Sequence, residues 1–427
     1  MIWVWVDKTY TGSEMMFRFG CDINLIICQK SKVQDWVEHF NSNYGDKHIM
    51  VYDLTVPIAL DTFLHTVIDA EMKWCKLIGV INYELVFRRK ELLKLKDFCM
   101  VLDESSLIQN PSAKRTKFIL KMKPKHCLML SGSPVGGKYE NLWTQLHLLG
   151  WDISLPLYEK QYVNWTLIEA GGFTHRIVDK ENPYKNIDRL KRKMREYGAV
   201  FKKTDGCFKL PEQIFTKVQV KAPSLYWKFQ KDSIVTFQDK EWSNQEVELV
   251  GDTSLTKLLY SRQICGQYCN DKLDAFEDLL NSTQERLIVF YNFDEELIRL
   301  KTICQNNGRF TSEINGHRKD LTAYEEDDSS VTLCQYQSAS MGLNLQKCCR
   351  IVYFSLPLSS EHFEQSKKRI HRIGQEKTCF YYIMMCRGTV EEQILKTLEE
   401  RRDFTDELFK MVEKNQKNKK EDSHHGD

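Results

Sequence analysis

QSASMGLNL at residues 337–345 and QSKKRIHRIGQ at residues 365–375 are the two stretches that decide how this chain is interpreted. The apolar residues 351–354 between them are typical of a buried strand. Arg369 and Arg372 are three positions apart, so we expect both to lie on one helical turn and point the same way. Two guanidinium groups on one face can bind a single phosphate cluster. A solvated helix face is the ordinary alternative, and the ordered residues around both arginines disfavour it.

The bulk composition limits the possible classes of protein. A chain of 427 residues is long enough for two or more domains, and its formal net charge of +2 gives no general argument for nucleic acid binding. The 14 cysteines are scattered, and neither Cys265 with Cys269 nor Cys348 with Cys349 has a matching second pair of metal ligands. This favours reduced thiols in a cytoplasmic protein. No apolar run approaches the roughly 20 residues of a membrane span, so we expect no membrane partner.

The order of residues in 337–375 resembles motifs V and VI of the SNF2-type superfamily 2 ATPases, and the likeness extends from residue 24 to about 404. Within that family its compact size resembles that of the small phage and bacterial members, and stretches between residues 161 and 212 resemble the annealing-helicase branch. The resemblance implies an α/β fold of two RecA-like lobes, each a parallel sheet flanked by helices, with helical SNF2-type insertions. It also implies ATP and Mg²⁺ as cofactors and the phosphate backbone of double-stranded DNA as partner, bound largely without regard to sequence.

An apolar strand over residues 98–102 ends in the adjacent carboxylates Asp103 and Glu104. At such a position one carboxylate can hold Mg²⁺ while the other orients and deprotonates a water molecule. The pair resembles motif II, which implies catalytic roles for Asp103 and Glu104, with Asp103 as the Mg²⁺ ligand. A cap for the next helix is the alternative. The same resemblance implies that Arg369 and Arg372 are catalytic, because they would neutralise charge on the γ-phosphate.

The phosphate loop of such a protein needs a glycine-rich turn followed by Lys and then Ser or Thr. Aligned on the downstream residues, Thr11 and Gly12 fall in the loop, Ser13 at the lysine position and Glu14 at the Ser/Thr position. The loop is therefore expected to be degenerate, which puts ATP hydrolysis in question. We expect the adenine-reading segment that the family places upstream to be missing, as a truncated start would explain.

Further site residues follow from the resemblance alone. It implies nucleotide contacts by Gly342 and Gln365. The expected DNA contacts are Lys30, Ser31, Asn82, Ser338 and Asn344. The expected coupling loop of motif III is Ser131, Gly132 and Ser133.

The strand and helix patterns place the domain boundaries. We expect lobe 1 over residues 1–215 with a helical insertion at about 151–197, lobe 2 over 216–410 with a leading helical segment at about 223–282, and a disordered tail over 411–427.

The sequence therefore predicts an ATP-dependent translocase or helicase on double-stranded DNA that acts in replication, repair or remodelling. Two alternatives remain open at this point. The first is an ATPase-impaired relative that serves as a DNA-binding clamp or scaffold. The second is a superfamily 2 helicase acting on single strands or RNA.

Overall fold

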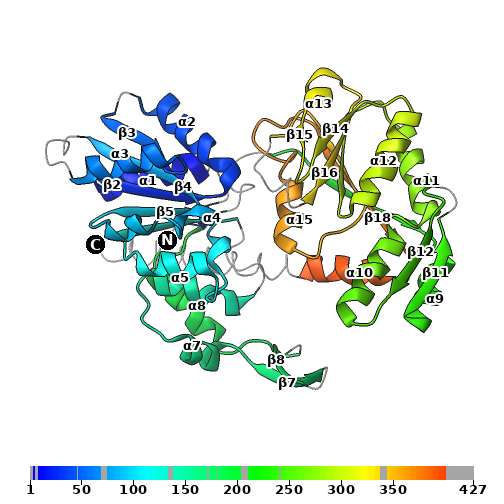
Figure 1. Cartoon of the computed structure of the whole chain (residues 1–427), viewed down its shortest axis with the longest axis horizontal. Coiled ribbons are helices and arrows are strands. Elements are labelled where there is room, and N and C mark those ends of the chain that lie inside the picture. The colour runs from blue at the N-terminus through cyan, green and yellow to red at the C-terminus, as the bar shows by residue number, and fades with distance from the viewer. Residues whose placement is uncertain are drawn as a thin grey trace, which may run out of the picture. The chain divides into compact units, whose positions relative to one another are not determined.

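The computed structural model (Figure 1) divides the chain into two compact units, one of residues 1–207 with 404–427 and the other of residues 208–403. The structure describes residues 3–4, 8–45, 47–68, 75–132, 138–170, 173–179, 181–202, 210–239, 242–336 and 344–400. The expected tail at 411–427 lies outside the described residues. The expected boundary after residue 215 falls inside β10 (Gln213–Val220), a strand of the second unit.

The first unit is built on a five-stranded sheet in which every neighbouring pair is parallel. In spatial order its strands are β3 (Ile49–Asp53), β4 (Lys76–Asn82), β2 (Ile23–Cys28), β5 (Cys99–Asp103) and β6 (His126–Leu130). Four of them coincide with the apolar runs in the sequence, which confirms the prediction of a parallel sheet. The strand that the sequence did not reveal is β3, whose residues are all only half-buried.

Helices cover both faces of this sheet (Figure 1). Ile26 and Cys28 of β2 pack in one core with α1 (Lys8–Phe19) and α2 (Val33–Asn43). Leu25 and Ile27 point the other way, into a core with α3 (Pro57–Ile68) and α5 (Lys114–Lys121). The alternation follows from the two-residue period of a strand. A further short parallel pair joins β1 (Trp3–Val4) to β9 (Phe201–Lys202).

The insertion at 151–197 is not wholly helical, as the sequence had suggested. Its elements are α7 (Leu155–Tyr162), β7 (Trp165–Ala170), β8 (Phe173–Val178) and α8 (Ile187–Glu196). The two strands form an antiparallel hairpin. Arg176 lies 4.0 Å from the ring centre of Trp165 and forms a 3.0 Å ion pair with Glu159 of α7. These cross-strand and strand-to-helix contacts favour a hairpin that the polar and aromatic composition did not indicate.

The second unit has a seven-stranded sheet, parallel except at its β15 edge. In spatial order its strands are β10, β18 (Cys379–Cys386), β17 (Arg350–Tyr353), β13 (Leu287–Tyr291), β16 (Val331–Gln335), β14 (Thr311–Ile314) and β15 (Lys319–Asp320). The sequence predicted the central strands and missed β10. This strand lies at the sheet edge and most of its residues are exposed or half-buried, so it carries no apolar run.

Helices also flank the second sheet, and a hairpin interrupts the expected helical segment at 223–282. The elements before β13 are α9 (Ser224–Asp232), β11 (Ile234–Gln238), β12 (Glu246–Val250), α10 (Ser254–Cys265) and α11 (Asn270–Asn281). Later helices are α12 (Asp294–Asn306), α13 (Thr322–Glu326) and α15 (Ser360–Lys367), and residues 390–400 are helical. Among the described residues, none of these helices is long and apolar enough to cross a membrane.

Candidate functional site

Lys8 and Glu104 join two elements of the first unit at the carboxyl end of its sheet. Lys8 is the first residue of α1, and Glu104 directly follows β5. Their side chains form an ion pair and are 22% and 17% exposed. The first N–H groups of a helix have no partner within the helix, so its N-terminus favours negative charge. Lys8 therefore adds a cation where the backbone already attracts anions.

Asp103 is the last residue of β5 and is held in place from two sides. Trp36 on α2 donates its indole N–H to Asp103 Oδ2 at 3.1 Å, and the Tyr83 hydroxyl donates to the Asp103 backbone oxygen at 3.0 Å. Burial raises the pKa of Asp103 above its ordinary value, against the lowering effect of Lys8, and the neighbouring Glu104 raises it further. A nearby cation stabilises the ionised form of such a buried carboxyl.

Glu104 has a backbone conformation that few residues adopt. Its φ of 55° and ψ of 60° lie in the left-handed region, directly before the 3-10 turn η4 (Ser105–Ile108). In the part of the chain that the structure describes, Glu104 Oε2 is buried without a hydrogen-bond partner. An unusual backbone and an unsatisfied buried oxygen at the same residue are typical of a functional position.

The expected position of the phosphate loop is wrong. Residues 10–14 lie inside α1, so Thr11 and Gly12 form no loop there. Ser13 is fully buried, and its hydroxyl donates to the Thr9 backbone oxygen at 2.9 Å. Glu14 accepts a 2.9 Å hydrogen bond from the Tyr44 hydroxyl. Burial, together with this bond, raises the pKa of Tyr44 to about 12. Ser13 is thus a packing residue of α1, and Glu14 is an exposed residue of the same helix that bonds to Tyr44.

Sequence reasoning passed over a second candidate for the phosphate site, Lys8 and Thr9. They are adjacent, in the order Lys then Thr that a phosphate loop requires, and they begin the helix that follows the loop position. The signal was present in the sequence. Aligning Gly12 with the loop glycine obscures this signal. A Cβ at Gly12 would come within 2.8 Å of the Leu130 side chain, so this glycine permits close packing of α1 on the sheet.

The expected DNA-contact residues of the first unit fall into two groups. Lys30 is exposed and begins the turn η1 (Lys30–Lys32), and Ser31 beside it is half-buried. Both are accessible after the carboxyl end of β2. Asn82 is only 2% exposed, and its amide donates to Glu84 at 2.8 Å. A buried amide committed to a neighbouring carboxylate does not fit the expected DNA contact.

The motif III loop follows β6 in the same unit. Ser131 is buried directly after the strand, Gly132 is half-buried, and Ser133 lies outside the described residues. Their expected coupling role stays a prediction.

The two arginines of the second unit do not share a helical turn, contrary to expectation. Helix α15 ends at Lys367, and residues 368–374 form turns in which Gly374 has a φ of 94°. Arg369 is only 8% exposed, whereas Arg372 is exposed. The directions of the Arg369 and Arg372 side chains therefore do not follow from helical spacing. The two arginines have different surroundings and can have different roles.

Hydrogen bonds tie the segment after α15 to the segment before β17. The Leu345 N–H donates to the Arg369 backbone oxygen at 3.2 Å, and the Gln375 amide donates to the Gln346 and Cys348 backbone oxygens at 3.0 Å each. The stretches 337–345 and 365–375 are thus neighbours in space where both are described.

The remaining expected residues of this unit are placed as follows. Asn344 is exposed and accepts a 3.4 Å bond from the Gln346 N–H. Gln365 lies on α15, where its amide donates to Glu361 at 3.3 Å. Ser338 and Gly342 lie outside the described residues.

Comparison with known protein families decides the membership of this chain. The model of the SNF2-related domain matches residues 11–272. The chain belongs to the SNF2 family. The model of the helicase conserved C-terminal domain matches residues 271–374. Together the two matches span both compact units of this SNF2 protein.

Relatives of this SNF2 protein include ATP-dependent helicases. It is 24% identical to the uncharacterized ATP-dependent helicase YqhH of Bacillus subtilis over 343 residues, which cover 73% of this chain and 60% of YqhH. It is 22% identical to an uncharacterized ATP-dependent helicase of Mycoplasma pneumoniae, covering 74% of this chain and 31% of that protein. It is 21% identical to mouse DNA excision repair protein ERCC-6, covering 90% of this chain and 28% of that protein. The chain thus spans between 28% and 60% of the length of these curated relatives.

Among solved structures, this SNF2 chain is similar to the Sulfolobus solfataricus SWI2/SNF2 ATPase core in complex with dsDNA. The matched region covers 92% of this chain and 84% of the Sulfolobus chain. The sequence identity is 18% and the TM-score is 0.39.

Proposed function

We propose that this SNF2 protein is an ATP-dependent translocase on double-stranded DNA and that Lys8 and Thr9 begin its phosphate site. The observation that carries the proposal is the ion pair between Lys8, at the N-terminus of α1, and Glu104, next to Asp103. A helix N-terminus with a lysine, facing two carboxylates at a strand end, is the donor and acceptor set that a Mg²⁺–nucleotide needs.

The residues of this site fit Mg²⁺ and ATP. Asp103 is a buried carboxyl whose ionised form Mg²⁺ would stabilise, and Trp36 donates to its Oδ2. Thr9 would add a hydroxyl ligand to the metal, and Lys8 would bind the phosphates. Bound Mg²⁺ would supply charge neutralisation at the transferring phosphate. Glu104, with its unpartnered oxygen, would orient the attacking water and accept its proton.

The second unit would contribute Arg372. This side chain is exposed in the segment after α15, so its guanidinium is accessible to a phosphate. A positioned arginine of this kind contributes roughly 10³ to 10⁵ in rate to related phosphoryl transfers. Arg369 is buried, which favours a role in fixing the segment over direct phosphate contact.

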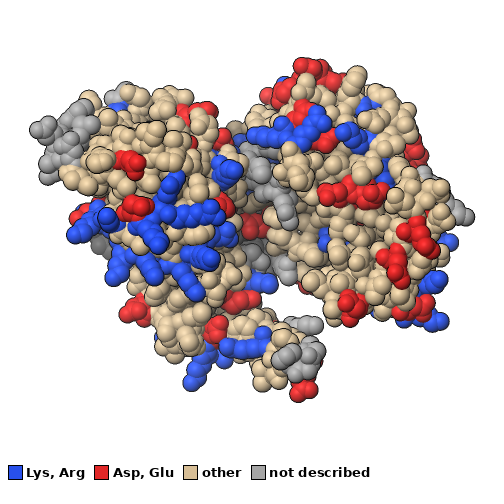
Figure 2. Space-filling model, viewed as in Figure 1, with Lys and Arg blue, Asp and Glu red and all other residues tan. Residues whose placement is uncertain are grey.

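Local positive charge supports binding to a nucleic acid backbone, although the chain as a whole is nearly neutral. Figure 2 shows lysine and arginine side chains gathered over α5 of the first unit. Lys114, Lys117 and Lys121 of that helix are exposed. Lys30 adds an exposed cation after β2. Contacts of this kind neutralise phosphates without reading bases, so binding should weaken steeply with salt.

The test is ATP hydrolysis by the purified chain, measured as phosphate release alone and with duplex DNA, single-stranded DNA or RNA. Glu104→Gln is the control for contaminating ATPases. We expect turnover that duplex DNA stimulates most and that the variant loses. Stimulation by single strands or RNA alone would replace the duplex proposal with the single-strand one. No turnover, with salt-sensitive DNA binding retained, would overturn the ATPase proposal.

A further inference from the structure

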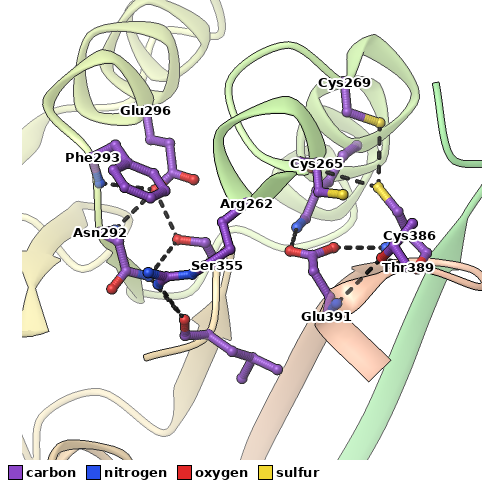
Figure 3. A network of polar contacts seen from close by, with 12 residues as sticks. Arg262, Cys265, Cys269, Asn292, Phe293, Glu296, Ser355, Cys386, Thr389 and Glu391 are labelled. Carbon is purple, nitrogen blue, oxygen red and sulfur yellow. Dashed lines mark hydrogen bonds and ion pairs between the residues drawn. The ribbon is translucent and has the colours of Figure 1, made fainter. Parts of the chain in front are cut away.

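A cluster of buried metal-binding side chains lies in the second unit, among residues to which the proposed ATPase gives no role. Cys265, Cys386 and Glu391 are all buried, and one ligand atom from each lies within 4.8 Å of the other two. Cys269 adds another sulfur, 3.6 Å from that of Cys386. Figure 3 shows the three sulfur atoms gathered on one side of the Glu391 carboxylate. Because these residues come from two distant stretches, the fold has brought them together.

We propose that this cluster is a structural zinc site. Cys265, Cys386 and Glu391, whose ligand atoms all lie within 4.8 Å of one another, would bind the metal, and Cys269, which lies outside that group but beside Cys386, would complete the set of four. Zinc accepts both cysteine sulfur and carboxylate oxygen as ligands, structural zinc sites are closed sets of four, and thiolates select zinc over magnesium or calcium. Zinc–sulfur bonds of roughly 2.3 Å at tetrahedral angles place two sulfurs roughly 3.8 Å apart. The sulfur–sulfur distance of 3.6 Å between Cys269 and Cys386 is close to that separation.

The surroundings hold these groups in position and compensate their charge. Lys272 is fully buried, and its ammonium lies 2.6 Å from Glu391 Oε1. The other carboxylate oxygen accepts a 2.8 Å hydrogen bond from the Cys386 N–H. Three thiolates and a carboxylate carry more negative charge than one Zn²⁺ cancels, and the Lys272 ammonium offsets part of the excess. Each thiol that binds the metal would release its proton to solvent.

A cavity borders the cluster at Cys269. Cys269 is one of the residues that line a cavity of about 920 Å³ in the second unit. The cavity also borders Asn270, at the start of α11, and Arg387, which directly follows Cys386. Zinc would fix four elements to one another at this point: the end of α10, the start of α11, the end of β18 and the start of the helix at residues 390–400.

The first experiment measures metal in the full chain, purified through a tag without histidines from cells grown with added zinc sulfate. We expect about one zinc per chain by mass spectrometry of the metal. We also expect its release by a mercurial thiol reagent and a lower melting temperature after release. Less than about one tenth of a zinc per chain would overturn the proposal.

Cobalt substitution tests the ligands themselves. We expect Co²⁺ to give a thiolate charge-transfer absorption whose intensity falls by about a third in Cys386→Ser or Cys269→Ser and stays unchanged in Cys304→Ser. Cys304 is a matched control because it is also a buried thiol of the second unit, on α12. If a serine variant fails to fold, the intensity of the charge-transfer absorption in the unmodified chain still reports the number of thiolates bound to Co²⁺. An absorption that is absent from the unmodified chain, or unchanged in Cys386→Ser, would overturn the proposal. None of these readouts depends on ATP hydrolysis.

Discussion

Lys8 and Glu104, 96 positions apart in the sequence, form an ion pair at the carboxyl end of the first sheet. The contact joins the start of α1 to the end of β5. It places an adjacent Lys-Thr pair beside an adjacent Asp-Glu pair, and our proposal for the nucleotide site rests on this relationship.

Lys8→Ala should lower DNA-stimulated ATP hydrolysis by ~10²-fold or more, because it removes the cation at the helix N-terminus. Phosphate release at saturating ATP is the measurement. The matched control is Lys193→Ala on α8, whose lysine pairs with Glu196 on the surface. Wild-type turnover in Lys8→Ala would refute the assignment of the phosphate site.

Ser13→Lys should destabilise the first unit and should not improve ATP binding. Ser13 is fully buried in α1, so the new ammonium would lose water without gaining a partner. We expect a loss of more than about 3 kcal/mol in the free energy of unfolding, measured with urea. Tighter ATP binding by this variant would restore the loop position that the sequence alone suggested.

Asp103→Asn should abolish hydrolysis and yet raise the melting temperature measured without nucleotide or metal. Because burial raises the pKa of Asp103, its contribution to stability is fully present below the ordinary pKa and is lost as the pH rises through the raised value. Asparagine does not ionise, so the variant avoids this loss of stability at high pH. The increase in melting temperature should therefore be larger at pH 8 than at pH 5, at about 2–4 °C for each kcal/mol of stability. A melting temperature that falls equally at both pH values would show that the carboxylate stabilises the fold.

Arg372→Ala and Arg369→Ala should have different effects. Replacing the exposed Arg372 should lower hydrolysis on the order of 10³-fold with an unchanged melting temperature. Replacing the buried Arg369 should destabilise the second unit by about 1–3 kcal/mol. Hydrolysis and thermal unfolding of both variants, with DNA binding as a third readout, separate the two roles. Unchanged turnover in Arg372→Ala would remove this residue from the proposed catalytic set.

Lys30→Ala should weaken binding to any duplex and reduce the slope of log affinity against log salt by about one. The matched control is Lys160→Ala, which removes an exposed lysine from α7. Fluorescence anisotropy with two unrelated duplexes at several salt concentrations measures the slope. An unchanged slope in Lys30→Ala would place the backbone contact elsewhere.

Local sequence predicted the buried parallel strands, because each is a short apolar run with polar residues at its carboxyl end. It failed at β3, at β10 and at the two hairpins, β7 with β8 and β11 with β12. These elements are partly exposed, so they bury too little apolar surface to leave a periodic signal, and pairing with a neighbouring strand stabilises them.

The sequence by itself determined the family and the strand-end carboxylates, because those signals lie in contiguous residues. Only the tertiary structure decided that Lys8, and not Ser13, faces Glu104, since helix α1 begins at Lys8 and buries Ser13. It alone separated Arg369 from Arg372, because α15 ends before both. It also brought Cys386 and Glu391 to Cys265, a meeting of distant segments that no local spacing reveals.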